Sequence, residues 1–319
     1  MARTLFGVSK SHGTDRESPG AAGDRTSGIT WALATAVISG FAIWVNRFGV
    51  AAWSDFGGSL AYTTAKNLIA AIVIAVIVWK VAPVSVPIRE LRRHWKGLTG
   101  IAVFGGAIPF ALFFEGLARA SSTQAAFIHK TLLLWVAALA IPLLGEKVRT
   151  THIVAIAALL GGQVALAGGV SGIAVGTGEM MILAATLMWS VEVIVAKRVL
   201  AAVPAGAVGL ARMGGGAAVL IVIGVVTGGA IPLGALGAEQ LLWVAVTGGV
   251  LAGYVYTWMN ALSLAPAIDV TAVLVGSVII TALLDAGPAG VLAAGPGFAL
   301  IAGGVAVLIF GWRRRAVRV

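Results

Sequence analysis

The sequence predicts an all-α membrane protein with ten transmembrane helices in two inverted five-helix repeats and with both termini in the cytoplasm. Three observations predict this fold. First, 59% of the 319 residues are hydrophobic and only 11% are charged, whereas a soluble domain has about 25% charged residues. Second, apolar runs of the length that crosses a bilayer, about 20 residues, recur along the chain. Third, the basic residues are distributed as the positive-inside rule requires.

The apolar runs predict each helix in turn. They lie near residues 28–48, 58–79, 97–117, 122–144, 150–170, 179–197, 206–227, 240–262, 268–285 and 293–311. Residues 213–238 and 286–312 contain no charged side chain. Because these runs are continuous, they exclude transmembrane barrel strands, in which apolar and polar residues alternate.

The basic residues predict the orientation of the helices. If the N-terminus is cytoplasmic, 17 of the 22 Lys and Arg residues lie in cytoplasmic segments, and only Arg47 and Arg119 lie in outer loops. The other three, Lys66, Lys130 and Arg212, lie inside predicted spans. Because the helix number is even, the C-terminus is also cytoplasmic. The net charge of +10 therefore indicates a lipid bilayer as the partner of this chain, and no nucleic acid.

Two tails flank the two predicted repeats. Residues 1–27 are polar and are expected to form a disordered cytoplasmic tail, without the apolar region and cleavage site of a signal peptide. Residues 28–172 are expected to form the first repeat and residues 173–312 the second. Residues 313–319 are expected to form a basic cytoplasmic tail.

Internal similarity supports the division into repeats. A shift of 150 aligns residues 33–48 with the segment that begins at Leu183, and a shift of 146 aligns Ala65 with Ala211. A shift of 145 aligns residues 123–140 with residues 268–285. Because each half has an odd number of helices, the halves insert with opposite orientation. Inverted repeats are typical of secondary transporters, whose substrate site lies near the midplane between the repeats.

Several short motifs occupy matching places in the two halves. Basic residues open the second helices at Lys66 and Arg212, and small residues close the third helices at 116–122 and 261–267. The sequence Leu144-Gly145-Glu146 ends the fourth helix, and Gly pairs lie in the fifth helices at 161–162 and 303–304. Together these features resemble the drug/metabolite transporter superfamily, specifically its EamA-type ten-helix members, over residues 28–311. The chain departs from the family pattern at 290–291 and at 129–131.

The resemblance implies a multi-pass protein of the plasma (inner) membrane that exports a small metabolite, driven by a proton or substrate gradient. Nothing in it implies a cofactor. The Gly248, Gly249 and Gly253 pattern of small residues allows close helix contact, either within the chain or in a homodimer.

Ionisable residues inside the spans are the candidate site, because a charge at a helix centre costs about 2.5–3.5 kcal/mol and needs a cavity or a counter-charge. Lys130 is expected to anchor a carboxylate or phosphate of the substrate; the alternative is a structural ion pair, for example with Glu192. His129 lies about 100° around the helix from Lys130, so both cannot point into one cavity. It is either a protonation gate or a packed neutral His. Glu192 is a candidate proton carrier.

Lys66 and Arg212 are expected either at the mouth of the cavity or snorkelling to structural partners. Glu115, Asp269 and Asp285 lie near span ends and are expected to reach the headgroup region. Four aromatic residues lie away from the extreme helix ends and are candidates for the cavity wall, although ordinary helix packing explains them equally: Trp44, Trp189, Tyr254 and Trp258.

Other functional classes are poorly supported. The chain lacks the H-E-x-x-H, P-loop and G-x-S-x-G motifs and has no Cys, so we expect neither an enzyme nor a metal site. No selectivity motif indicates a channel. The sequence therefore predicts a secondary active transporter that exports a small anionic or zwitterionic metabolite, such as an amino acid, by alternating access. The alternative is a proton-coupled exporter of cationic drugs that uses Glu192.

Overall fold

The computed structural model describes residues 19–81, 88–166, 176–228, 231, 234, 236–293 and 295–316, and this part of the chain is helical without strands. The α-helices are α1 (Pro19–Ala52), α2 (Gly58–Val76), α3 (Ile88–Arg93), α4 (Trp95–Ile101), α5 (Ile108–Leu117), α6 (Ser122–Lys130), α7 (Leu132–Leu144), α8 (Thr150–Leu166), α9 (Thr177–Val199), α10 (Ala205–Leu210), α11 (Gly216–Thr227), α12 (Ala238–Leu264), α13 (Ala267–Val275), α14 (Ser277–Ala293) and α15 (Gly295–Ala316). Three π-helical segments continue α2, α4 and α10: η1 (Ile77–Val81), η2 (Ala102–Ala107) and η4 (Ala211–Gly215).

The all-helical membrane fold is confirmed. Eight stretches are long and apolar enough to cross a bilayer: Arg25–Ala52, Gly58–Lys80, Trp95–Leu117, Gln124–Leu144, Thr177–Val199, Ala205–Thr227, Ala238–Leu264 and Ala267–Asp285. Each lies over one of the predicted runs. The two remaining runs coincide with shorter apolar helices, at Thr150–Leu166 and Gly295–Val307.

The first helix begins earlier than the sequence predicted. It starts at Pro19, nine residues before the expected start at Gly28, so the end of the expected disordered tail is helical. Arg25 lies in this extension and forms an ion pair with Asp269 of α13, a contact that sequence periodicity cannot reveal. Residues 1–18 of the expected tail, and residues 317–319 of the basic tail, lie outside the described residues.

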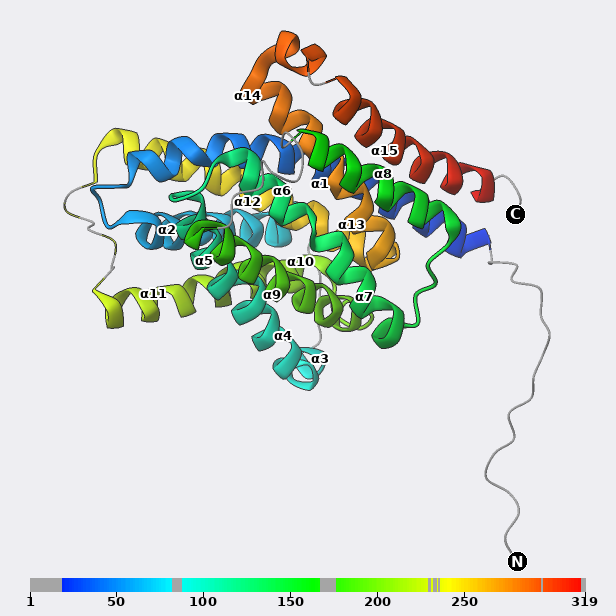
Figure 1. The fold of residues 1–319 in the computed structure, drawn as a ribbon. Helices are drawn as coiled ribbons and strands as arrows, with labels where there is room; N and C mark the ends of the chain where they lie inside the picture. The colour runs from blue at the N-terminus through cyan, green and yellow to red at the C-terminus, as the bar shows by residue number, and fades with distance from the viewer. Residues whose placement is uncertain are drawn as a thin grey trace, which may run out of the picture.

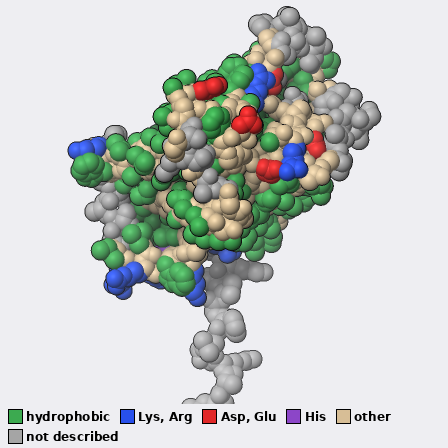
Figure 2. Space-filling view, turned by 90° about the vertical axis from the view of Figure 1, so that its left-hand side faces the viewer, with side chains coloured by type: hydrophobic (Ala, Val, Ile, Leu, Met, Phe, Trp, Pro, Cys, Tyr) green, Lys and Arg blue, Asp and Glu red, His purple; other side chains and the backbone are tan. Residues whose placement is uncertain are grey.

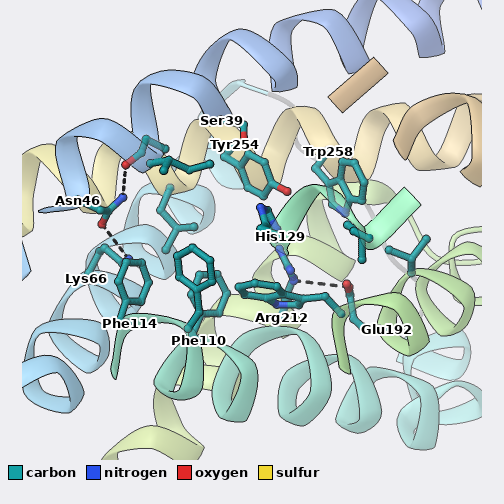
Figure 3. Close-up of a pocket in the computed structure, with 17 residues that line it drawn as sticks. Ser39, Asn46, Lys66, Phe110, Phe114, His129, Glu192, Arg212, Tyr254 and Trp258 are labelled. Carbon is teal, nitrogen blue, oxygen red and sulfur yellow. Dashed lines mark hydrogen bonds and ion pairs between the residues drawn. The ribbon is translucent and has the colours of Figure 1, made fainter. Parts of the chain in front are cut away.

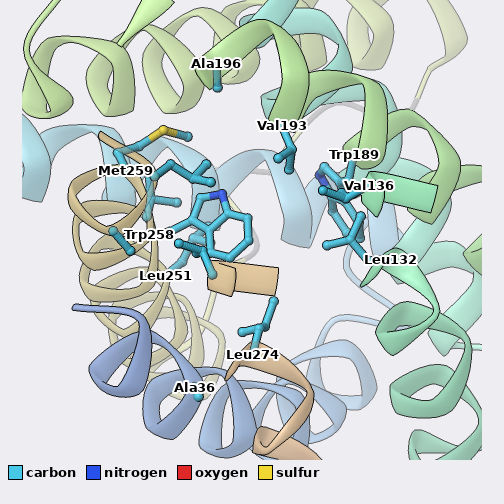
Figure 4. Packing of buried hydrophobic residues seen from close by; sticks show 14 of the residues in the cluster. Ala36, Leu132, Val136, Trp189, Val193, Ala196, Leu251, Trp258, Met259 and Leu274 are labelled. Carbon is cyan, nitrogen blue, oxygen red and sulfur yellow. The ribbon is translucent and has the colours of Figure 1, made fainter. Parts of the chain in front are cut away.

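The helices of the two predicted halves are interleaved in space (Figure 1). α1 and α2 of the first half both pack along α12 of the second half, and α5 and α7 pack against α9. α8 and α15 pack along each other at one side of the bundle. The buried core lies where these helices meet, and Figure 4 shows side chains of α7, α9, α12 and α13 that contribute to it.

Glycines allow the contact between α8 and α15. A Cβ atom on Gly162 would lie 2.7 Å from the Gly297 carbonyl oxygen, and one on Gly304 would lie 3.1 Å from that of Ala155. A Cβ atom on Gly161 would meet nothing within 4 Å. One member of each predicted Gly pair therefore faces the other half, as close helix contact requires.

The two segments predicted as the fourth helix of each half are interrupted at matching positions. Thr131 separates α6 from α7, and Gly276 separates α13 from α14; these positions differ by 145, the shift found in the sequence. The local bonds also match, because Thr131 N–H donates to Ile128 O and Gly276 N–H donates to Val273 O, both at 3.1 Å. Interrupted helices at corresponding positions of two halves are typical of transporter binding sites.

The exterior is apolar, as a lipid-facing surface requires. Val225 and Val226 of α11 are 68% and 79% exposed. Figure 2 shows the end of the molecule that is predicted to face outward: hydrophobic side chains cover much of it, and acidic and basic side chains lie next to one another. Arg47 pairs with Asp285, and Arg119 pairs with Glu115. These partners are partly exposed, as the sequence predicted for Glu115 and Asp285.

Candidate functional site

A cavity of about 70 Å³, measured as the space open to the centres of water-sized spheres, lies between the two predicted halves. Its wall combines a few polar or charged groups with many aromatic rings, a mixture that is typical of small-molecule sites. The lining residues are Ser39, Ala42, Ile43, Asn46, Lys66, Phe110, Phe113, Phe114, His129, Leu132, Trp189, Glu192, Val193, Arg212, Leu251, Tyr254 and Trp258.

Lys66 of α2 forms one end of the cavity (Figure 3). Its Nζ atom donates to Asn46 Oδ1 at 3.1 Å, and Tyr62 Oη donates to the same oxygen at 2.7 Å. The ammonium also lies 3.2 Å from the ring centroid of Phe114 and 5.6 Å from that of Phe110. These cation–π contacts stabilise a cation that is only 1% exposed. The side chain therefore does not snorkel to the headgroups.

Arg212 and Glu192 form the other end of the cavity. The Nε atom of Arg212 lies 3.5 Å from Glu192 Oε1, and the two side chains are 4% and 1% exposed. Both carboxylate oxygens, as well as Nε and Nη1 of Arg212, lack a hydrogen-bond partner among the described residues. Buried polar groups are rarely left without such partners, so these atoms can bind a ligand or water that enters the cavity.

Two π-helical segments position this end of the site. Arg212 projects from η4, and the backbone of η4 packs against η2 so closely that a Cβ atom on Gly106 would overlap the Arg212 carbonyl oxygen. Asn67 Nδ2 donates to Gly106 O at 2.8 Å, and Trp189 Nε1 donates to Gly105 O at 3.0 Å. These side chains satisfy carbonyl groups of η2. π-Helical turns are frequent at functional sites.

Phe110 lies between the two cations. The Cζ atom of Arg212 is 5.6 Å from its ring centroid, the same distance as Lys66 Nζ. Figure 3 shows Lys66 and Arg212 on opposite sides of this ring. The cavity thus has a basic side chain at each of its two ends, joined by an aromatic wall, and the Arg212 end also holds the carboxylate of Glu192.

His129 faces the cavity, whereas Lys130 does not. The imidazole ring packs against Phe113 and Trp189, at centroid distances of 5.5 and 5.1 Å. Lys130 Nζ instead donates to Ser39 Oγ at 3.1 Å and lies 3.4 Å from His129 Nδ1. As predicted, the two neighbours do not both line the cavity. The counter-charge of Glu192 is Arg212, not Lys130.

Three of the four predicted aromatic residues line the cavity: Trp189, Tyr254 and Trp258. Tyr254 and Trp258 are stacked, with ring centroids 6.1 Å apart and an interplanar angle of 10°. Trp44 is not part of the lining. It packs against Phe48 near the end of α1, where Arg47 lies 5.4 Å from its ring.

The sequence did not single out Asn46, Ser39 or the aromatic residues of α5. Helix α5 contributes three aromatic rings to the cavity wall, from Phe110, Phe113 and Phe114. Their i, i+3, i+4 spacing in the sequence already indicates that they lie on one face of the helix. Asn46 is a polar residue inside the first predicted span, and a buried amide there also indicates a functional contact.

A second polar cluster lies outside the cavity and joins α1, α8 and α13. His152 Nε2 lies 2.8 Å from Asp269 Oδ1, and Arg25 binds the other oxygen of this carboxylate. Asp269 is only 8% exposed, so the expectation that it reaches headgroup water is wrong. Arg25 and His152 compensate its charge within the protein. No group of three or more possible metal ligands occurs in the described part of the chain.

Comparison with known proteins gives a family match over part of the chain and a likeness of fold. Residues 26–167 match the family model described as "EamA-like transporter family". No curated protein matches the chain. A solved structure described only as "Crystal structure of protein" has a TM-score of 0.66 and 20% sequence identity, and the match covers 92% of this chain and 97% of that one. This likeness concerns the fold.

The match and the apolar helices together establish the kind of protein. The expected resemblance is confirmed over the first half, and the chain is a multi-pass protein of the plasma membrane. Over residues 26–167, this chain is similar to the EamA-like transporter family, which belongs to the drug/metabolite transporter superfamily.

Proposed function

We propose that this protein is a secondary active transporter that exports a small anionic or zwitterionic metabolite by alternating access. One observation carries the proposal. A cavity between the two predicted halves contains the buried, charged side chains of Arg212 and Glu192, which form an ion pair but whose Nε, Nη1 and carboxylate oxygen atoms lack hydrogen-bond partners among the described residues. Charged groups inside a membrane protein that face a cavity generally mark a substrate or ion pathway.

The proposal includes a membrane arrangement of ten spans, in two inverted halves with both termini cytoplasmic. α8 and α15 supply the two spans beyond the eight longer stretches, and their mutual packing makes them a matched pair. The interruptions at Thr131 and Gly276 support the equivalence of the halves.

Single cysteines would test this arrangement, because the natural chain has none. Cysteine at Lys96 or Lys147 should react with an impermeant maleimide only from the cytoplasmic side, and cysteine at Asp55 or Glu239 only from the outside. Labelling of Asp55→Cys and Lys147→Cys from the same side would contradict the ten-span arrangement.

In the proposed site, Lys66 and Arg212 face the substrate directly, and Lys130 supports the wall through Ser39. The apolar part of the substrate is enclosed by four ring side chains, those of His129, Trp189, Tyr254 and Trp258. Trp44 is assigned no substrate contact.

Uptake into proteoliposomes tests the transport function. The purified protein is given labelled amino acids and organic anions, with and without an imposed pH gradient, and empty liposomes are the control. We expect saturable uptake of at least one anion or zwitterion. Retention of that uptake in both Lys66→Gln and Arg212→Gln, or no uptake beyond the control, would contradict the proposal.

Export of a cationic drug is the second candidate, and Glu192 favours it. Its carboxylate lines the cavity and has no hydrogen-bond partner among the described residues. Under this alternative, Glu192→Gln abolishes gradient-driven accumulation of a lipophilic cation. Under the first proposal, the same variant still transports the anion. Accumulation of a lipophilic cation, with no anion or zwitterion transported, would replace the first proposal.

A further inference from the structure

Each end of the cavity pairs a basic side chain with a polar side chain from another helix, but the charge of this polar side chain differs between the two ends. Lys66 and Arg212 differ by 146 in number, which is the repeat shift of their helices. Each faces a polar residue on the first helix of its own half: Lys66 faces Asn46 of α1, and Arg212 faces Glu192 of α9. The partner is therefore a neutral amide at one end and a carboxylate at the other.

This difference leaves Lys66 without a counter-charge. Its described contacts are Asn46 and the rings of Tyr62, Phe110 and Phe114, and it makes no ion pair with any described residue. The ordinary arrangement for a buried cation is an ion pair. Among the charged side chains that line the cavity, Glu192 is the only carboxylate, and it already lies against Arg212.

The surroundings of Lys66 determine which anion fits. A carboxylate bound there would place the rest of its molecule against rings of the cavity wall, including Phe110, Phe113 and Trp189. An α-ammonium group next to that carboxylate would lie close to Lys66, and like charges in an apolar site repel strongly. Glu192 lies beyond Phe110 with Arg212, so it is badly placed to compensate this ammonium. A phosphate dianion would bring a second charge that Lys66 alone does not neutralise.

We propose that Lys66 binds the carboxylate of a monoanionic organic acid with an aromatic or similarly bulky apolar body and with no ammonium group beside the carboxylate. This inference rests on the proposed transport function and narrows its substrate class. Asn46 is the specificity-determining residue, because it leaves the charge of Lys66 available for the ligand.

Three probes with the same ring test the inference: 3-phenylpropionate, phenylalanine and 2-phenylethylamine. Each is measured as a labelled substrate in proteoliposomes that contain the full-length protein. We expect 3-phenylpropionate to be taken up with a KM at least tenfold lower than that of phenylalanine, and we expect no uptake of the amine. Preference for phenylalanine would overturn the inference but leave the transport proposal intact.

Two variants place the effect at Lys66. Lys66→Gln should lower 3-phenylpropionate uptake at least tenfold. Asn46→Asp keeps the ammonium but gives it a carboxylate partner, as Glu192 does for Arg212, and should reverse the preference towards phenylalanine. A gain of phenylalanine uptake cannot come from misfolding. Asn260→Asp is the matched control, because Asn260 of α12 is not among the cavity-lining residues and donates to Tyr256 O.

The remaining outcomes are also decisive. If Asn46→Asp retains the preference for 3-phenylpropionate, the proposed role of the amide is wrong. If other anions of the wider panel are transported but none of the three probes is, the aromatic substrate class is wrong. If nothing in the panel is transported, the transport proposal itself fails.

Discussion

Gly106 shows how one residue without a side chain positions a charged group. Its Cα lies against the backbone of η4, where Arg212 projects into the cavity. We expect Gly106→Ala to destabilise the protein by about 1–3 kcal/mol, because the added methyl group overlaps backbone that cannot move freely. Thermal unfolding in detergent measures this effect. Gly100→Ala is the control, since a Cβ atom there meets nothing within 4 Å. Equal melting temperatures for the two variants would contradict the close contact.

At the residue scale, the sequence singled out most of the ionisable residues that line the cavity but not its neutral amide, and Lys130 does not line it. Glu192, Lys66, Arg212 and His129 all line the cavity, and each is detectable because ionisable residues are rare inside membrane spans. Asn46 was missed because an amide carries no charge. The partner of Glu192 could not be predicted, because pairing depends on how helices from different parts of the chain pack.

At the element scale, the start of α13 depends on a side chain from another helix pair. Glu146 follows α7, and its two oxygens accept hydrogen bonds from Ala267 N at 2.7 Å and Ile268 N at 3.0 Å. A carboxylate satisfies the free N–H groups of a helix N-terminus and interacts favourably with its dipole. The Glu of the Leu-Gly-Glu motif therefore joins the first half to the second.

We expect Glu146→Ala to lower the unfolding free energy by about 1–2 kcal/mol, a typical cost for losing a helix cap. Glu146→Gln should lose less, because its amide oxygen still accepts one bond. Thermal unfolding and amide exchange in the first turn of α13 measure the effect. Unchanged exchange at Ala267 and Ile268 in Glu146→Ala would show that the cap contributes nothing.

The positions of helices were largely predictable, whereas their internal irregularities were not. Eight predicted runs coincide with long apolar stretches, because length and hydropathy are local properties of the sequence. The π-helical segments η2 and η4 contact each other although they lie far apart in the sequence, and such a contact is not a local property of the sequence. The early start of α1 likewise reflects the pairing of Arg25 with Asp269.

At the scale of the whole molecule, the contact between α8 and α15 joins the last helices of the two predicted halves. Glycine variants at this contact test whether it stabilises the protein. Gly162→Ala should destabilise the protein by about 1–3 kcal/mol through overpacking against Gly297 and Ile301. The adjacent Gly161→Ala should leave stability unchanged, because a Cβ atom at Gly161 meets nothing within 4 Å. Thermal unfolding compares the two, and equal stability would argue against this packing.

The neutral amide opposite Lys66 also has an electrical consequence. The cavity of the empty protein holds one uncompensated positive charge at Lys66, and a bound monoanion would cancel it. A complete cycle moves the one negative charge of the monoanion, so transport would generate a current, and the uncompensated charge of Lys66 would place this charge movement in the return step of the empty protein. A membrane potential is worth about 2.3 kcal/mol per elementary charge per 100 mV. Because the interior of a cell is negative, the potential would add to any ion gradient that drives such an anion outward.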